Sequence, residues 1–152
     1  RLYSTYYWQY NSILRFTEFR PEPDPVSSDI DNLGDSWMDL YEDSDFKDRR
    51  LSIRDLGRAE FSNYQDLNVH GGPIDRGLSS GRFQIPQGKF YRLFDRPNFR
   101  GQHLDLVGTG RVESIPNFKR ISLGSKVRST HPRLRGKSRV NFGDRVASSR
   151  LA

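Results

Sequence analysis

Two separate stretches of the chain alternate apolar and polar residues with a period of two. Leu104 and Leu106 are flanked by polar residues, and Leu51 and Ile53 are flanked in the same way earlier in the chain. A half-buried strand shows this alternation because successive side chains point to opposite faces of a sheet. The pattern therefore predicts an all-β domain built from two similar units.

An aromatic pair with a following glycine marks the turn in the second stretch. Phe94 and Phe99 lie on either side of a turn that contains Pro97, and Gly101 follows. The two rings are expected to meet and cover the bend, and Gly101 supplies a positive φ without a steric penalty. Ser125 is expected to open the last strand of this unit, where its hydroxyl would satisfy backbone groups of the bend.

The first stretch repeats this spacing with two changes. Tyr41 and Phe46 stand where the aromatic pair stands in the second stretch. Asp48 occupies the glycine position, and Asp tolerates the left-handed region better than most residues. Asp66 occupies the serine position. The first copy is therefore expected to have the same fold with a weaker sequence signal.

Each of the two stretches resembles a Greek-key motif of the βγ-crystallins. The resemblance implies a two-motif Greek-key β-sandwich with extended N- and C-terminal tails. The expected domain covers residues 36–130, after an aromatic and then acidic, proline-rich extension at 1–35 and before a basic tail at 131–152.

Many microbial members of that family bind calcium through acidic or Asn residues placed just before the last strand. The matching residues here run from Arg120 to Ser125 in the second copy and from Phe61 to Asp66 in the first. Arginine and isoleucine cannot supply the hard oxygen ligands that calcium requires. Calcium binding is therefore not expected.

Composition and charge narrow the class of protein. The chain has 152 residues, 34% of them hydrophobic, and no cysteine, which excludes a disulfide scaffold and thiolate metal sites. No apolar run is long enough to span a membrane. Residues 21–48 hold ten acidic residues and one lysine, whereas residues 132–152 hold six basic residues and one aspartate. Such blocks suggest charged surfaces that contact other molecules.

Two groups of residues are the candidates for binding a partner. Residues 1–20 are dense in aromatics, which are enriched in interface anchors, although they could equally pack on their own domain. The N-terminal candidates are Tyr6, Tyr7, Trp8 and Tyr10. The C-terminal candidates, which could lie along a protein or along RNA, are Arg133, Arg135, Lys137 and Arg139.

No arrangement of residues predicts catalysis, a cofactor or a metal. Residues 77–81 match the G-x-S-x-G pattern, but the helix that a nucleophile elbow requires does not follow. The three histidines have no ligand spacing. We therefore expect that the protein is not an enzyme.

These observations favour a non-catalytic structural or accessory subunit that docks through its tails into a larger protein assembly. An organellar, and in particular mitochondrial, complex suits a basic chain without cysteine. Its first residue, Arg1, fits a chain whose targeting segment has been removed or whose start is missing. The alternatives are an RNA- or ribosome-associated basic protein and, with less in its favour, a secreted crystallin-like toxin, inhibitor or calcium-binding protein.

Overall fold

The computed structural model describes residues 3–9, 12–18, 29–67, 72 and 77–152. This part of the chain is nearly all β, with short 3-10 turns and no α-helix, as the alternating pattern predicts. None of its helical turns is long and apolar enough to cross a membrane.

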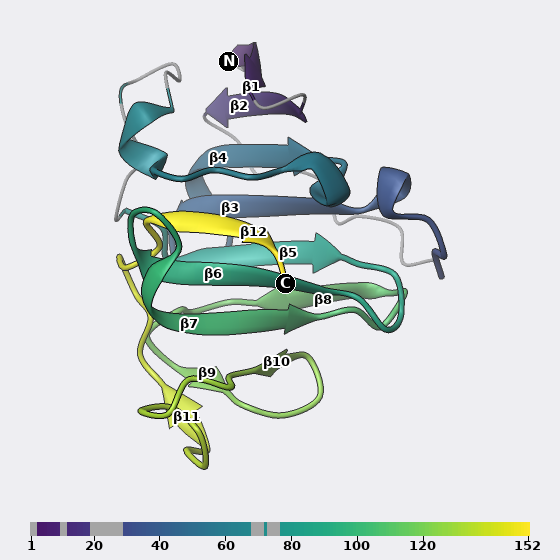
Figure 1. Ribbon diagram of the computed structural model, residues 1–152. Helices are drawn as coiled ribbons and strands as arrows, with labels where there is room; N and C mark the ends of the chain where they lie inside the picture. The colour runs from purple at the N-terminus through teal and green to yellow at the C-terminus, as the bar shows by residue number, and fades with distance from the viewer. Residues whose placement is uncertain (1–2, 10–11, 19–28, 68–71, 73–76) are drawn as a thin grey trace.

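The strands are antiparallel and fall into three sheets (Figure 1). The first sheet has the order β1-β2-β4-β3-β5-β8, with bounds β1 Tyr3–Gln9, β2 Ser12–Glu18, β4 Lys47–Arg54, β3 Trp37–Asp43, β5 Ser80–Gln84 and β8 Val112–Ile115. The second has the order β10-β7-β6-β12, with bounds β10 Val127–Arg128, β7 Arg100–Val107, β6 Phe90–Arg96 and β12 Ser148–Leu151. The small third sheet pairs β9 Ile121–Ser122 with β11 Arg139–Val140. The 3-10 turns are η1 Leu33–Asp35, η2 Leu56–Arg58 and η3 Tyr64–Asp66.

The core lies between the first and second sheets and is built from the alternating residues. Leu51 and Ile53 of β4 are fully buried. Leu104 and Leu106 of β7 are at most 2% exposed. They belong to one continuous apolar cluster, which also includes Tyr91 of β6. Burial of large apolar side chains on the facing sides of two sheets is the main stabilising term of such a sandwich.

Each copy of the repeat forms a Greek key. In the first copy, the hairpin β3–β4 is followed by a long connection, and β5 then returns to pair with β3. In the second copy, β12 returns in the same way to pair with β6 of the hairpin β6–β7. A fourth strand that returns beside the first defines this motif. The two-motif Greek-key sandwich expected from the sequence is therefore confirmed.

The two copies also exchange their third strands. β8 of the second copy pairs with β5 of the first. In the reciprocal position, Phe61 of the first copy forms a β-bridge with Ser149 in β12 of the second. Each of the two larger sheets is therefore bordered by backbone from the other copy.

The expected domain boundary at residue 130 is wrong. Residues 131–152 are not a tail, because β12 pairs with β6 in the second sheet and Val146 is fully buried in the core. A second strand that the sequence pattern did not predict is β5, which pairs with β3 in the first sheet. Both strands were missed because they are short and their partners lie far away in the sequence.

The N-terminal extension includes a hairpin that enlarges the first sheet. β1 pairs with β2, and β2 pairs in turn with β4. Figure 1 shows this hairpin at one end of the molecule and the strands β9 and β11 at the other. The proline-rich part of the extension, and Tyr10, lie outside the described residues.

Candidate functional site

The bend of the second copy is held by its aromatic pair, its glycine and a serine from β12. Phe94 and Phe99 pack edge to face with their ring centroids 5.8 Å apart. Gly101 has a φ of +83°. The Ser148 hydroxyl donates to the carbonyl of Arg96 at 2.6 Å and accepts from the backbone N–H of Phe99 at 3.1 Å. One hydroxyl thus satisfies two backbone groups of the bend.

The first copy repeats this geometry. Tyr41 and Phe46 pack edge to face at 5.7 Å, and Asp48 has a φ of 68°. The Ser80 hydroxyl donates to the carbonyl of Asp43 and accepts from the N–H of Phe46 at 3.1 Å. The two bends are therefore equivalent, each closed by the first residue of its returning strand.

The serine positions expected from the sequence need correction. Asp66 is exposed in the turn η3, and Ser125 lies in an exposed bend before β10. Neither begins the strand that closes its copy; Ser80 and Ser148 do. In both copies a long connection precedes the closing strand, so the closing serine comes later in the chain than the expected residue.

A Ser-x-Arg pattern could have identified the correct positions. Arg82 follows Ser80 by two residues, and Arg150 follows Ser148 by two residues. The guanidinium of Arg82 lies 4.0 Å from the ring centre of Phe46, and that of Arg150 lies 4.2 Å from the ring centre of Phe99. Cation–π packing of this kind covers the second ring of each aromatic pair.

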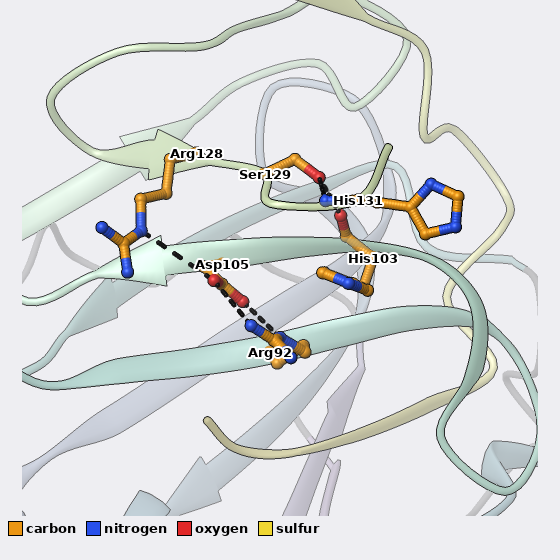
Figure 2. Close-up of polar contacts among 6 residues, drawn as sticks. All are labelled: Arg92, His103, Asp105, Arg128, Ser129 and His131. Carbon is orange, nitrogen blue, oxygen red and sulfur yellow. Dashed lines mark hydrogen bonds and ion pairs between the residues drawn. The ribbon is translucent and has the colours of Figure 1, made fainter. Parts of the chain in front are cut away.

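The face of the second sheet that points away from the core holds a buried charge. Asp105 is completely buried, and its carboxylate accepts from the Nε of Arg92 at 2.7 Å and lies 3.9 Å from the Nε of Arg128. Figure 2 shows the two arginines on either side of this carboxylate. The hydrogen bond to Asp105 raises the pKa of Arg92. The group is fully paired, so it acts as a structural tie across β6, β7 and β10.

Two histidines, His103 and His131, lie beside this charged group (Figure 2). The rings of His103 and His131 pack edge to face at 5.4 Å, and Ser129 donates to the carbonyl of His103 (Figure 2). Burial, aided by the charge of Arg92, lowers the pKa of His103 below its usual value. His103 is therefore neutral at physiological pH.

The described residues form neither a metal-binding cluster nor a nucleophile elbow. There, no three side chains of His, Asp or Glu converge in a way that could hold a metal ion. The hydroxyl of Ser79, in the G-x-S-x-G pattern, donates to the Asp144 carboxylate at 3.2 Å. Strand β5 begins directly after Ser79, where a nucleophile elbow requires a helix. The residues directly before the two closing serines are 75–79 and 143–147, and not the segments compared with the calcium motif in the sequence. The expected absence of calcium binding stays an untested prediction.

The C-terminal partner candidates gather on one exposed loop, residues 131–140, which we call the basic loop. Its four exposed cations are Arg133, Arg135, Lys137 and Arg139. Among the described residues, no carboxylate forms an ion pair with any of them. Tyr6, Tyr7 and Trp8 lie in β1, and their side chains are outside the described part.

The basic loop borders a cleft of about 290 Å³ beside the bend of the second copy. We call this the basic cleft; its lining residues are Asp95, Arg96, Gly101, Gln102, His131, Arg133 and Arg145. Sequence reasoning missed two of these residues. Arg96 is far from the basic loop in sequence, and Arg145, which follows the loop closely, approaches Arg96 only when β12 returns to β6.

Comparison with known proteins adds a likeness in fold. No protein-family model matches the sequence, and no curated protein is significantly similar to it. A solved structure described as "Evolution of the eye lens beta-gamma-crystallin domain fold" is similar to it with a TM-score of 0.48 and 15% identity, over 84% of this chain and 93% of that chain. The two-motif Greek-key sandwich itself is established by the strand pairing, and it agrees with the βγ-crystallin resemblance of the sequence. A fold alone does not define a function.

Proposed function

We propose that the protein is a non-catalytic docking subunit, in which the crystallin-like sandwich carries the basic loop to an acidic partner in a larger protein assembly. The observation that carries this proposal is the exposure of Arg133, Arg135, Lys137 and Arg139 on one loop, without ion pairs in the described structure. Clustered cations of this kind speed association with an acidic surface and select against basic ones.

The basic loop is anchored and therefore presents its charges in a defined place. Leu134 and Val140, on either side of Arg135, Lys137 and Arg139, are buried in the apolar cluster. β11 pairs with β9, and the N–H of Leu123 donates to the carbonyl of Ser138 at 2.9 Å. A loop tied down at both ends loses less conformational entropy on binding than a free tail does.

The other end of the molecule offers a second means of attachment. β1 is the last strand of the first sheet, and within the described structure it pairs only with β2. An edge strand presents unpaired backbone groups to which a partner strand can add. This edge supports docking in a protein assembly more than it supports binding to RNA.

The test compares two triple variants of the full chain by size fractionation of native extracts. Arg135→Glu, Lys137→Glu and Arg139→Glu reverse the basic loop, whereas Lys47→Glu, Arg58→Glu and Lys89→Glu reverse three exposed cations elsewhere. The natural chain and the control should migrate with a large assembly, and the loop variant should elute at its monomer mass. Elution of the natural chain as a monomer, or retention of the loop variant in the assembly, would refute the proposal.

The partner class and the compartment are tested on the same material. Treatment with ribonuclease should leave the large assembly intact; its collapse would replace the protein partner with RNA, the second candidate. We also propose a mitochondrial location, which rests on the basic, cysteine-free composition. Fractionation of organelles that leaves the chain outside mitochondria would reject it.

A further inference from the structure

The basic cleft has a charge pattern that its own residues do not neutralise. Arg96, Arg133 and Arg145 all line it, and none of the three forms an ion pair within the described structure. Asp95 is the single carboxylate in the lining, and one of its oxygens already accepts from the backbone N–H of Gln102 at 2.9 Å. Three guanidinium groups around one small cleft repel one another unless an anion lies between them.

His131 also lines the cleft, and one of its ring nitrogens has no hydrogen-bond partner in the described structure. Its Nδ1 accepts from the backbone N–H of Arg133 at 3.1 Å. In the neutral ring the proton therefore sits on Nε2, which is free to donate. The His131 ring also packs edge to face against His103, with the ring centroids 5.4 Å apart.

The backbone on both sides of the cleft is held in place. The carbonyl of Arg96 accepts from Ser148 at 2.6 Å, which fixes this side to the bend of the second copy. Arg145 is next to Val146, which is fully buried, and Leu134 beside Arg133 is also buried. The cationic side chains thus extend from fixed points, which lowers the entropic cost of gathering them around a ligand.

The size and chemistry of the cleft fit one type of group. A volume of about 290 Å³ is at the lower end of small-molecule sites, with room for a tetrahedral anion and a few attached atoms. Guanidinium groups bind phosphate oxygens in a bidentate manner, and an imidazole N–H adds a further donor. We propose that the basic cleft binds a phosphate monoester group or free phosphate, at a site that shares Arg133 with the basic loop but does not include its other cations, Arg135, Lys137 and Arg139.

The test is an NMR titration of the full chain with inorganic phosphate, against sodium chloride at equal ionic strength. Phosphate should cause saturable shifts of the backbone signals of Gln102, His131 and Arg133, which chloride does not cause. The variant Arg133→Gln with Arg145→Gln should weaken phosphate binding by at least about tenfold, the loss expected when charge-assisted hydrogen bonds are removed. The matched control Arg135→Gln with Lys137→Gln should bind phosphate within about twofold of the natural chain.

Two further ligands distinguish the sources of the phosphate group. Tighter binding of a phosphoserine peptide than of inorganic phosphate would assign the site to a phosphorylated macromolecule, and the reverse order would assign it to free phosphate. Absence of saturable shifts with both ligands refutes the proposal. Equal weakening by the cleft and control variants also refutes it, because the surface would then be a general polyanion binder. The docking proposal would survive either result, since its triple variant leaves Arg96, Arg133 and Arg145 unchanged.

Discussion

Replacement of Gly101 by alanine tests how the bend of the second copy is held. Gly101 has a φ of +83°, in the left-handed region. A Cβ at this position would overlap the carboxylate oxygen of Asp95 and lie 3.0 Å from the Cγ of Arg96. That carboxylate oxygen accepts from the N–H of Gln102 at 2.9 Å. Alanine therefore imposes an unfavourable backbone conformation and also displaces a side chain that caps the bend.

The cost follows from these two effects. A non-glycine residue in the left-handed region costs about 1–2 kcal/mol. Loss of the hydrogen bond to the Asp95 carboxylate costs about 1.5–3 kcal/mol. Alanine also restricts the unfolded chain, which offsets about 0.4–1 kcal/mol. We expect a net loss of about 3 kcal/mol in the free energy of unfolding, or a fall in Tm of roughly 6–12 °C for a chain of this size.

Gly88→Ala is the matched control. Gly88 has nearly the same φ, +85°, but a Cβ there would have no neighbour within 4 Å. It should lose only about 1 kcal/mol, because the conformational cost stands alone. Urea unfolding of the natural chain and both variants measures the difference. Equal destabilisation by the two substitutions would show that the Asp95 contact contributes nothing, and an unchanged Gly101→Ala variant would refute the bend itself.

The remaining predictions concern a serine, a buried hydroxyl and a histidine. Ser148→Ala should cost about 2 kcal/mol by urea unfolding, because a backbone N–H loses its acceptor, whereas Ser125→Ala should stay within about 0.5 kcal/mol; equal effects would contradict the corrected serine position. Tyr91→Phe should cost about 1–3 kcal/mol, because the buried carbonyl of Ala59 loses its donor at 2.7 Å, and a variant as stable as the natural chain would reject that bond. Because the pKa of His103 is lowered in the folded state, the unfolded chain takes up the proton first, and stability should fall as the pH drops below about 6.5 until the folded state is protonated too. His103→Gln should flatten that slope, and identical slopes for the two proteins would contradict the assignment.

Local spacing was enough to predict the hairpins and their bends. The two aromatic pairs, the strands that carry Leu51 and Leu104, and the all-β class all depend on residues that are near one another in sequence. An aromatic pair five residues apart in sequence and a turn between two alternating runs leave few structural alternatives. For this reason the sandwich could be predicted before its strand order was known.

The returning strands could not be placed by the same reasoning. The sequence does not show which distant segment pairs with β3 or β6, and a loop can be lengthened at a small entropic cost. The connection that precedes Ser148 is longer than the one that precedes Ser80, and both closing serines come later in the chain than Asp66 and Ser125, the positions expected from the sequence. The domain boundary at residue 130 and the segments compared with the calcium motif were misplaced for the same reason.

The difference in length between the two connections bears on the proposed partner site. The bends, the closing serines and the stacked arginines are shared by both copies, so the sandwich itself requires them. The segment 119–146 makes the second connection the longer one, and it holds β9, β10, β11 and the basic loop. The exposed cations of the basic loop within it have no ion-pair partner in the described structure and repel one another, which gives the isolated fold no benefit. Other parts of the segment pack in the core, so it is this unpaired surface charge, and not the whole segment, that the proposed anionic partner would explain.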